Sequence, residues 1–135
     1  MLGEKIGEST GRITTQRVLP PDAAGMKIEV SFQSTGRLLA QDVTEVGTYW
    51  STPRPGGAMY GEGQGILTLK NGEICTWQGS GIGKPKANGT GIAFRGCVYY
   101  QTNSAQLSRL NGTCAVFEYE ADENGNTKSQ LWEWR

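Results

Sequence analysis

Two rows of glycine on either side of an Asn-Gly dipeptide constrain the fold of this chain more than any other feature. Asn71-Gly72 lies between two β-prone runs in the segment 60–83, and this dipeptide favours the two positive φ angles of a type I′ turn. The segment is therefore predicted to be a β-hairpin. Because side chains alternate along a strand, the glycines of each arm share a face. They are Gly61, Gly63 and Gly65 on the first arm and Gly79, Gly81 and Gly83 on the second. Such rows let a strand coil, or let large side chains from across a barrel come close.

Alternation of apolar and polar residues predicts further strands on both sides of this hairpin. The clearest is 26–33, where Ile28, Val30 and Phe32 point one way and polar residues the other. We expect proline and glycine turns at 20–22, 34–36, 53–57 and 85–89. The predicted strands cover residues 4–18, 26–33, 37–51, 60–70, 73–83, 91–101, 113–121 and 127–135. One short helix is expected over 103–110, with a left-handed stop at Asn111-Gly112.

These elements predict an all-β fold for a single domain covering residues 1–135. Most connections are short and no helix is long enough for a parallel crossover, so successive strands should pair antiparallel as a meander. Eight such strands can close into a barrel whose interior holds side chains or one small ligand. A β-sandwich is the alternative.

Charge and composition exclude several classes of function. Lysine plus arginine and aspartate plus glutamate both number 13, so no excess charge attracts nucleic acid or a membrane surface. No apolar run resembles a signal or a membrane span, and a cytoplasmic location is expected. The chain has no histidine and its three cysteines are far apart, so we expect no metal ion and no cofactor. The cysteines are expected to be buried apolar groups in strands.

The segments 95–102, 110–112 and 118–122, preceded by the Gly-x-Gly-x-Gly strands, resemble small uncharacterised bacterial proteins. Those proteins are similar to the allene oxide cyclase type of eight-stranded barrel. The resemblance implies a barrel that is often oligomeric through its outer surface. It does not imply the chemistry of the plant cyclase, because none of that enzyme's catalytic residues can be matched to a position in this chain.

Charged and phenolic side chains on neighbouring predicted strands are the candidates for catalysis. Arg95 lies on the strand before the one that carries Glu118, so the two can pair across strands. An inward-facing pair would be desolvated and could bind a carboxylate or transfer a proton, whereas an outward-facing pair would be a surface ladder. The outward arrangement is preferred, since charged side chains are mostly exposed. Tyr99 and Glu62 complete the catalytic candidates.

Aromatic residues supply the candidates for ligand binding. Trp77, Tyr99 and Tyr119, with Arg95 for an anionic group, could line a cavity, and core packing is the alternative for these rings. Three hypotheses for function follow. The preferred one is binding of a small, partly apolar molecule in the barrel of a homo-oligomer. The others are an isomerase or cyclase type enzyme that uses carboxylate or tyrosine proton transfer, and a structural oligomer without ligand.

Overall fold

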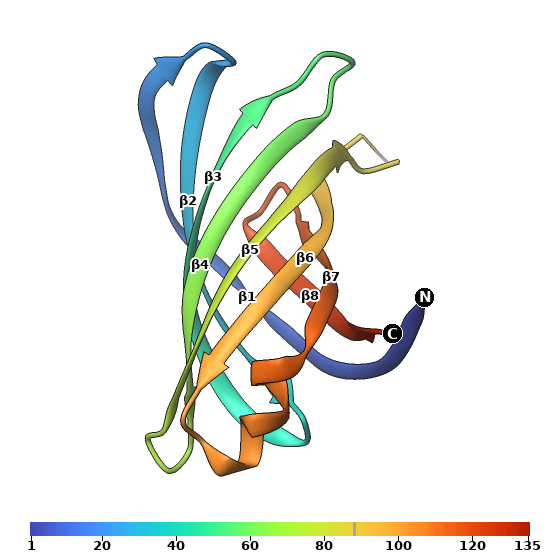
Figure 1. Ribbon diagram of the computed structural model, residues 1–135. Helices are drawn as coiled ribbons and strands as arrows, with labels where there is room; N and C mark the ends of the chain where they lie inside the picture. The colour runs from blue at the N-terminus through green and yellow to red at the C-terminus, as the bar shows by residue number, and fades with distance from the viewer. Residues whose placement is uncertain (88) are drawn as a thin grey trace.

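The computed structural model describes residues 1–87 and 89–135, and its eight strands form one closed antiparallel barrel (Figure 1). Each strand pairs with the next in sequence, and β8 pairs with β1. The strands are β1 (Leu2–Asp22), β2 (Gly25–Leu38), β3 (Gln41–Pro53), β4 (Met59–Leu69), β5 (Ile74–Pro85), β6 (Ile92–Thr102), β7 (Cys114–Ala121) and β8 (Asn126–Trp134). The predicted meander barrel is confirmed, and the alternative β-sandwich is not formed.

The first strand is longer than predicted and contains the prolines that were expected to end it. β1 continues through Pro20 and Pro21 to Asp22. It pairs with β8 only as far as Arg12, and beyond that residue it pairs with β2 alone. A proline has no N–H to donate, and this is tolerated where one side of a strand has no ladder partner.

The predicted turn at 34–36 is wrong, because β2 runs straight through these residues. The chain reverses instead at Leu39 and Ala40, which both have positive φ angles of 48° and 65°. Gly36 serves another purpose. A Cβ atom at this position would overlap the carbonyl oxygen of Glu8 and lie 2.7 Å from Cα of Ser9, so the glycine permits close contact between β1 and β2.

The hairpin of β4 and β5 is confirmed, but its turn is not of type I′. Gly72 has a positive φ of 89°, whereas Asn71 does not. The N–H of Gly72 donates to the carbonyl of Leu69, and the N–H of Leu69 donates to the carbonyl of Glu73, each at 2.9 Å. This is a type I turn followed by a left-handed glycine bulge. The carboxamide oxygen of Asn71 accepts a hydrogen bond from the N–H of Glu73, which stabilises the turn.

A single short helix closes one end of the barrel. The 3₁₀ helix η1 (Ala105–Gly112) confirms the predicted helix, and its side chains Leu107 and Leu110 are completely buried in the main apolar cluster. Gly112 has no positive φ, so the predicted left-handed stop is wrong. The carboxamide of Asn111 instead exchanges two hydrogen bonds of 2.9 Å with the backbone of Thr102, which joins the helix to β6.

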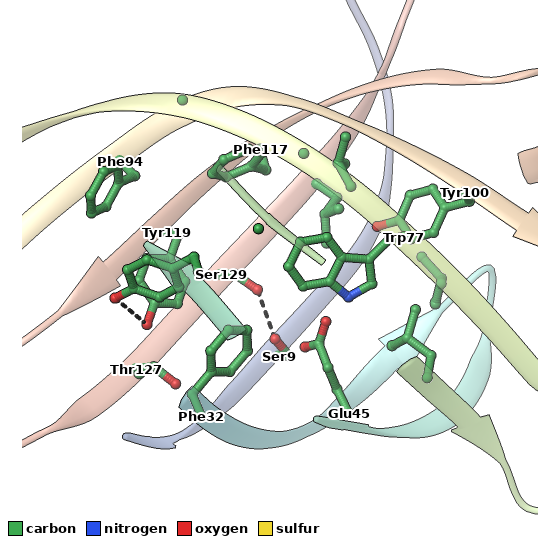
Figure 2. A pocket seen from close by; sticks show the side chains of 18 of the residues that line it. Ser9, Phe32, Glu45, Trp77, Phe94, Tyr100, Phe117, Tyr119, Thr127 and Ser129 are labelled. Atoms are coloured by element: carbon green, nitrogen blue, oxygen red, sulfur yellow. Dashed lines mark hydrogen bonds between the residues drawn. The ribbon is translucent and has the colours of Figure 1, made fainter. Parts of the chain in front are cut away.

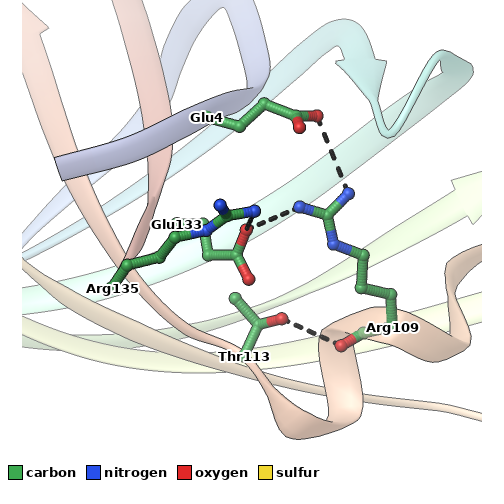
Figure 3. Close-up of polar contacts among 5 residues, drawn as sticks. All are labelled: Glu4, Arg109, Thr113, Glu133 and Arg135. Carbon is green, nitrogen blue, oxygen red and sulfur yellow. Dashed lines mark hydrogen bonds and ion pairs between the residues drawn. The ribbon is translucent and has the colours of Figure 1, made fainter.

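Ion pairs join η1 to the two terminal strands (Figure 3). Arg109 donates to Glu133 of β8 at 2.6 Å and lies 3.7 Å from Glu4 of β1. Arg135 also contacts Glu133, at 3.3 Å. The hydrogen bond from Arg109 holds the pKa of Glu133 below its usual value. These contacts orient the helix against the barrel end. No helix in the described part of the chain is long and apolar enough to cross a bilayer.

The glycine rows face the barrel interior, and the large side chains that lie against them belong to paired residues of neighbouring strands rather than to strands across the barrel. A Cβ atom at Gly65 would collide with the indole of Trp77, and one at Gly83 would collide with the ring of Phe94. Gly47 of β3 makes room for the ring of Phe32 in the same way. The missing side chains therefore leave space in which aromatic rings cross the interior, and this positions the site described next.

Candidate functional site

A cavity of about 110 Å³ lies inside the barrel, between the end closed by η1 and a cluster of aromatic rings (Figure 2). All eight strands contribute to its wall, and most of the lining is apolar. Apolar cavities of about 150 Å³ hold a benzene molecule. The space inside this barrel is therefore close to that of a single six-membered ring.

Four aromatic side chains from four strands form the cluster at one side of the cavity. They are Phe32 of β2, Tyr49 of β3, Phe94 of β6 and Tyr119 of β7. Their ring centroids lie 5.5–6.3 Å apart in tilted and edge-to-face arrangements, which aromatic pairs prefer. The hydroxyls of Tyr49 and Tyr119 are 3.2 Å apart. Burial raises the pKa of both phenols, so both stay neutral at physiological pH.

One carboxyl group lies in this apolar interior. Glu45 of β3 shares the inward face with Val43 and Tyr49, and the hydroxyl of Ser34 donates to its Oε1 at 2.7 Å. Burial raises the pKa of Glu45, because desolvation penalises the charged form more than the hydrogen bond from Ser34 and the facing indole N–H of Trp77 favour it. A carboxyl in such surroundings is a usual feature of binding and catalytic sites.

The indole N–H of Trp77 lies on the same side of the cavity as Glu45 (Figure 2). Its Nε1 atom is buried and faces the carboxyl of Glu45, but among residues 1–87 and 89–135 it is the one buried side-chain nitrogen or oxygen without a hydrogen bond of ordinary length and angle. Buried polar groups are nearly always hydrogen-bonded, so an unpartnered one calls for an explanation. The hydroxyls of Ser9 and Ser129, which also line the cavity, are hydrogen-bonded to each other at 2.7 Å.

Among the residues that the structure describes, Glu45 has no basic partner inside the barrel. Three other charged residues border the cavity, namely Glu8, Arg37 and Glu62. Their side chains are largely exposed on the outer wall, where Glu8 pairs with Lys5, Arg37 pairs with Asp42, and Glu62 accepts a hydrogen bond from Tyr60. Among the cavity residues that the structure describes, Glu45 therefore carries the one interior carboxyl, and no lysine or arginine side chain neutralises it.

The predicted site residues separate into two groups. Trp77 and Tyr119 line the cavity, as a ligand-binding role requires. Arg95 and Glu118 lie on the outer wall, with a 3.5 Å ion pair between side chains that are 80% and 47% exposed. Tyr99 is 57% exposed on the same wall. The enzyme hypothesis required Arg95 and Glu118 to face a cavity, and in this structure neither side chain does so.

The cysteines and the terminal tryptophans lie away from the polar groups of the cavity. Cys75 is completely buried in the apolar cluster, and burial raises the pKa of its thiol to about 11. Cys97 and Cys114 are only partly buried, which differs from the expectation that each cysteine is a buried apolar group. Trp132 and Trp134 alternate with Leu131, which lines the cavity, so the two indoles point outward.

Glu45 is the site residue that reasoning from the sequence missed. The strand predicted over 37–51 is partly apolar on both faces, so its pattern alone does not assign either face to the interior. The signal was nevertheless present in the sequence. One face of this strand carries Val43, Glu45, Gly47 and Tyr49, and Gly47 continues the inward glycine pattern of β4 and β5. A carboxylate in the middle of such a face predicts a polar group inside the barrel.

No protein-family model and no curated protein matches the chain. Solved structures do match it over nearly its whole length. A protein of unknown function from Clostridium acetobutylicum ATCC 824 has a TM-score of 0.82 at 13% identity, with 98% of both chains covered. A conserved protein of unknown function from Rhodopseudomonas palustris has a TM-score of 0.80 at 14% identity, with 98% of this chain and 97% of that chain covered.

A β-barrel-like protein from Acinetobacter baumannii AYE has a TM-score of 0.83 at 15% identity, with 98% of this chain and 94% of the other covered. The likeness shows the fold alone. The chain is thus similar in fold to bacterial proteins of unknown function, and any function has to be argued from its own site.

Proposed function

We propose that the barrel binds one small, largely apolar molecule of about the size of a single ring in its interior. The observation that carries this proposal is the cavity of about 110 Å³, which has aromatic walls and a single interior carboxyl without a basic partner. We also propose that the barrel is related to the allene oxide cyclase type, and only the fold supports this relation. Neither the resemblance nor the fold brings a reaction with it.

The composition of the cavity wall supports a binding role. Small-molecule sites are usually concave and mostly apolar, with a few polar groups that fix the orientation of the ligand. Here the rings of Phe32 and Tyr119 supply apolar surface, and Glu45 and Trp77 supply the polar groups. Drug-sized ligands occupy roughly 300–1,000 Å³, so this cavity suits a much smaller molecule.

Binding is tested with toluene as a probe of the cavity. Isothermal titration calorimetry of the purified protein should show one site per chain, and native mass spectrometry reports any molecule retained through purification. Replacing Ser129 by leucine places a larger side chain in the cavity and should weaken toluene binding at least about tenfold. The control is Thr10→Leu on the exposed face of β1, which should leave binding unchanged. Absence of binding to the unaltered protein by toluene and by other probes of one ring would refute the proposal.

A second candidate function, self-association, is favoured by an uncharged outer face. Eleven neighbouring outward positions on β3 to β6 carry no charged side chain. They are Thr44, Val46, Thr48, Gln64, Ile66, Thr68, Ile74, Thr76, Gln78, Tyr99 and Gln101. Several of the apolar ones are exposed, including Val46, Ile66 and Ile74. A symmetric dimer brings one patch against its own copy, and a patch without charge avoids like-charge repulsion there.

Sedimentation velocity tests this second candidate. The protein should sediment as a homo-oligomer, and Ile66→Lys, in the middle of the uncharged outer face, should shift it towards the monomer. Val18→Lys is the matched control, because Val18 is also exposed but lies on the part of β1 that extends beyond β8. A protein that is monomeric at all working concentrations would overturn this candidate and leave the interior site unaffected.

A further inference from the structure

We propose that the molecule bound in the barrel is a single-ring compound with a hydroxyl group, of the phenol or cyclic alcohol class. Its hydroxyl would donate a hydrogen bond to the carboxyl of Glu45 and accept one from the indole N–H of Trp77. This inference rests on the proposed function, because it concerns the same cavity. It adds the chemical class of the ligand and the atoms that recognise it.

Trp77 supplies the first half of the argument. An indole nitrogen donates one hydrogen bond and accepts none. Nε1 of Trp77 is buried and faces the Glu45 carboxyl, yet no group among the described residues lies at ordinary hydrogen-bond distance and angle from it. The ring itself is held in place, because it lies against the backbone of Gly65 and Gly47. The N–H therefore has a fixed position, and an acceptor placed in the cavity between it and Glu45 can satisfy it.

Glu45 supplies the second half. A carboxyl group has two oxygens and can accept several hydrogen bonds, of which Ser34 provides one, to Oε1. No lysine or arginine side chain in the described part of the interior provides another. The remaining capacity calls for a donor in the cavity, on the same side as the indole N–H (Figure 2).

A hydroxyl is the group that meets both demands with one atom, since it donates one hydrogen bond and accepts others. A hydrocarbon meets neither demand. An ether oxygen can accept from Trp77 but cannot donate to Glu45, and an ammonium group has the opposite defect. A carboxylate would place a second acidic group beside Glu45 with no cation to compensate for it. The aromatic walls and the volume of the cavity limit the remainder of the molecule to about one ring.

The experiment compares five probes of similar size that differ in their polar group, namely phenol, toluene, anisole, benzylamine and benzoate. Dissociation constants are measured by isothermal titration calorimetry with the full-length protein. Phenol should bind at least about tenfold more tightly than toluene or anisole, since a hydrogen bond to a charged or buried group contributes roughly that factor. Benzoate should bind most weakly.

Two tryptophan variants connect the preference to the proposed atoms. Trp77→Phe removes the N–H and keeps an aromatic ring, so it should reduce the preference for phenol over toluene by about tenfold while toluene still binds. Trp50→Phe is the matched control on the outer wall, where Trp50 contacts Lys27, and it should leave the preference unchanged. Circular dichroism confirms that both variants fold.

The possible outcomes separate this inference from the proposed function. If toluene binds and phenol binds no more tightly, a water molecule satisfies Trp77 and Glu45, and only the hydroxyl inference fails. If benzylamine or benzoate binds more tightly than phenol, the ligand class is wrong. A phenol preference that survives Trp77→Phe also overturns the inference. If none of the five probes binds, both proposals fail.

Discussion

Replacing Leu107 by alanine tests whether η1 stabilises the barrel by closing its end. The Leu107 side chain is completely buried among the apolar residues that line this end, with Leu110 and Leu69 in the same cluster. Truncation to alanine removes three carbon atoms, and about 0.8 kcal/mol for each gives about 2.4 kcal/mol of lost burial. The cavity left behind adds to this, so the free energy of unfolding should fall by about 3–4 kcal/mol.

Guanidinium chloride denaturation, followed by tryptophan fluorescence and far-UV circular dichroism, measures this loss. Val18→Ala is the control, because Val18 is 85% exposed and its truncation should change stability by less than about 0.5 kcal/mol. If Leu107→Ala does not fold at all, Leu107→Met preserves the volume and should cost less than about 1.5 kcal/mol. A loss below about 1 kcal/mol for the alanine variant would show that η1 rests on the barrel without contributing to its core.

Four further substitutions test single features of the fold and the site. Gly65→Ala should destabilise the protein by about 1–3 kcal/mol and change its near-UV circular dichroism, because the new methyl group displaces the indole of Trp77. Gly112→Ala should raise the free energy of unfolding by about 0.4–1 kcal/mol, because the position has open space and no positive φ and alanine lowers the entropy of the unfolded chain. Ala40→Gly should raise the free energy of unfolding by about 0.5–1 kcal/mol in thermal melts. A positive φ of 65° costs alanine more than glycine loses in chain entropy. Glu45→Gln should remove the part of the pH dependence of stability that comes from the Glu45 carboxyl. Burial holds the folded-state pKa of Glu45 above its usual value of 4.5, so the folded protein binds more protons and loses stability as pH rises from that value to the raised pKa. The glutamine variant should be more stable than the unaltered protein at pH 7.5. If the free energies of unfolding of the two proteins change with pH in parallel, this reasoning is refuted.

The arrangement of strands could be predicted from the sequence because it depends on local signals. The apolar alternation of residues 26–33 and the glycine rows on either side of Asn71-Gly72 each specify extended chain and its faces. The same glycine rows indicated space for large side chains, and the rings of Trp77 and Phe94 occupy it. A meander needs little more than the order of such elements, since each strand pairs with the next.

The connections between strands were harder to predict where a residue served a different contact. Glycine is a residue type that favours turns, but Gly36 instead permits close contact between β2 and Ser9 of β1. Leu39 and Ala40 carry no turn signal, and their positive φ angles are imposed by the pairing of β2 with β3 on both sides. Tertiary pairing overrides local preference in both cases.

Part of the candidate site could be predicted in the same way. Trp77 and Tyr119 share inward faces with glycine or apolar residues, which the pattern of each strand shows. The role of Glu45 depends on the absence of a basic partner inside a closed barrel, and that property belongs to the whole fold. No local pattern reveals that the nearest lysine and arginine side chains lie outside the wall.

The pairing of β8 with β1 has a consequence for the kinetics of folding. Seven of the eight ladders join neighbouring strands, and each can form as a local hairpin. The eighth joins the two ends of the chain, as in the hydrogen bond between Ser9 and Ser129, which are 120 positions apart. Closing so large a loop is entropically costly, so the ring of strands is completed late, after the hairpins. Until then β1 and β8 are open sheet edges, and the unfinished barrel is the species most exposed to aggregation.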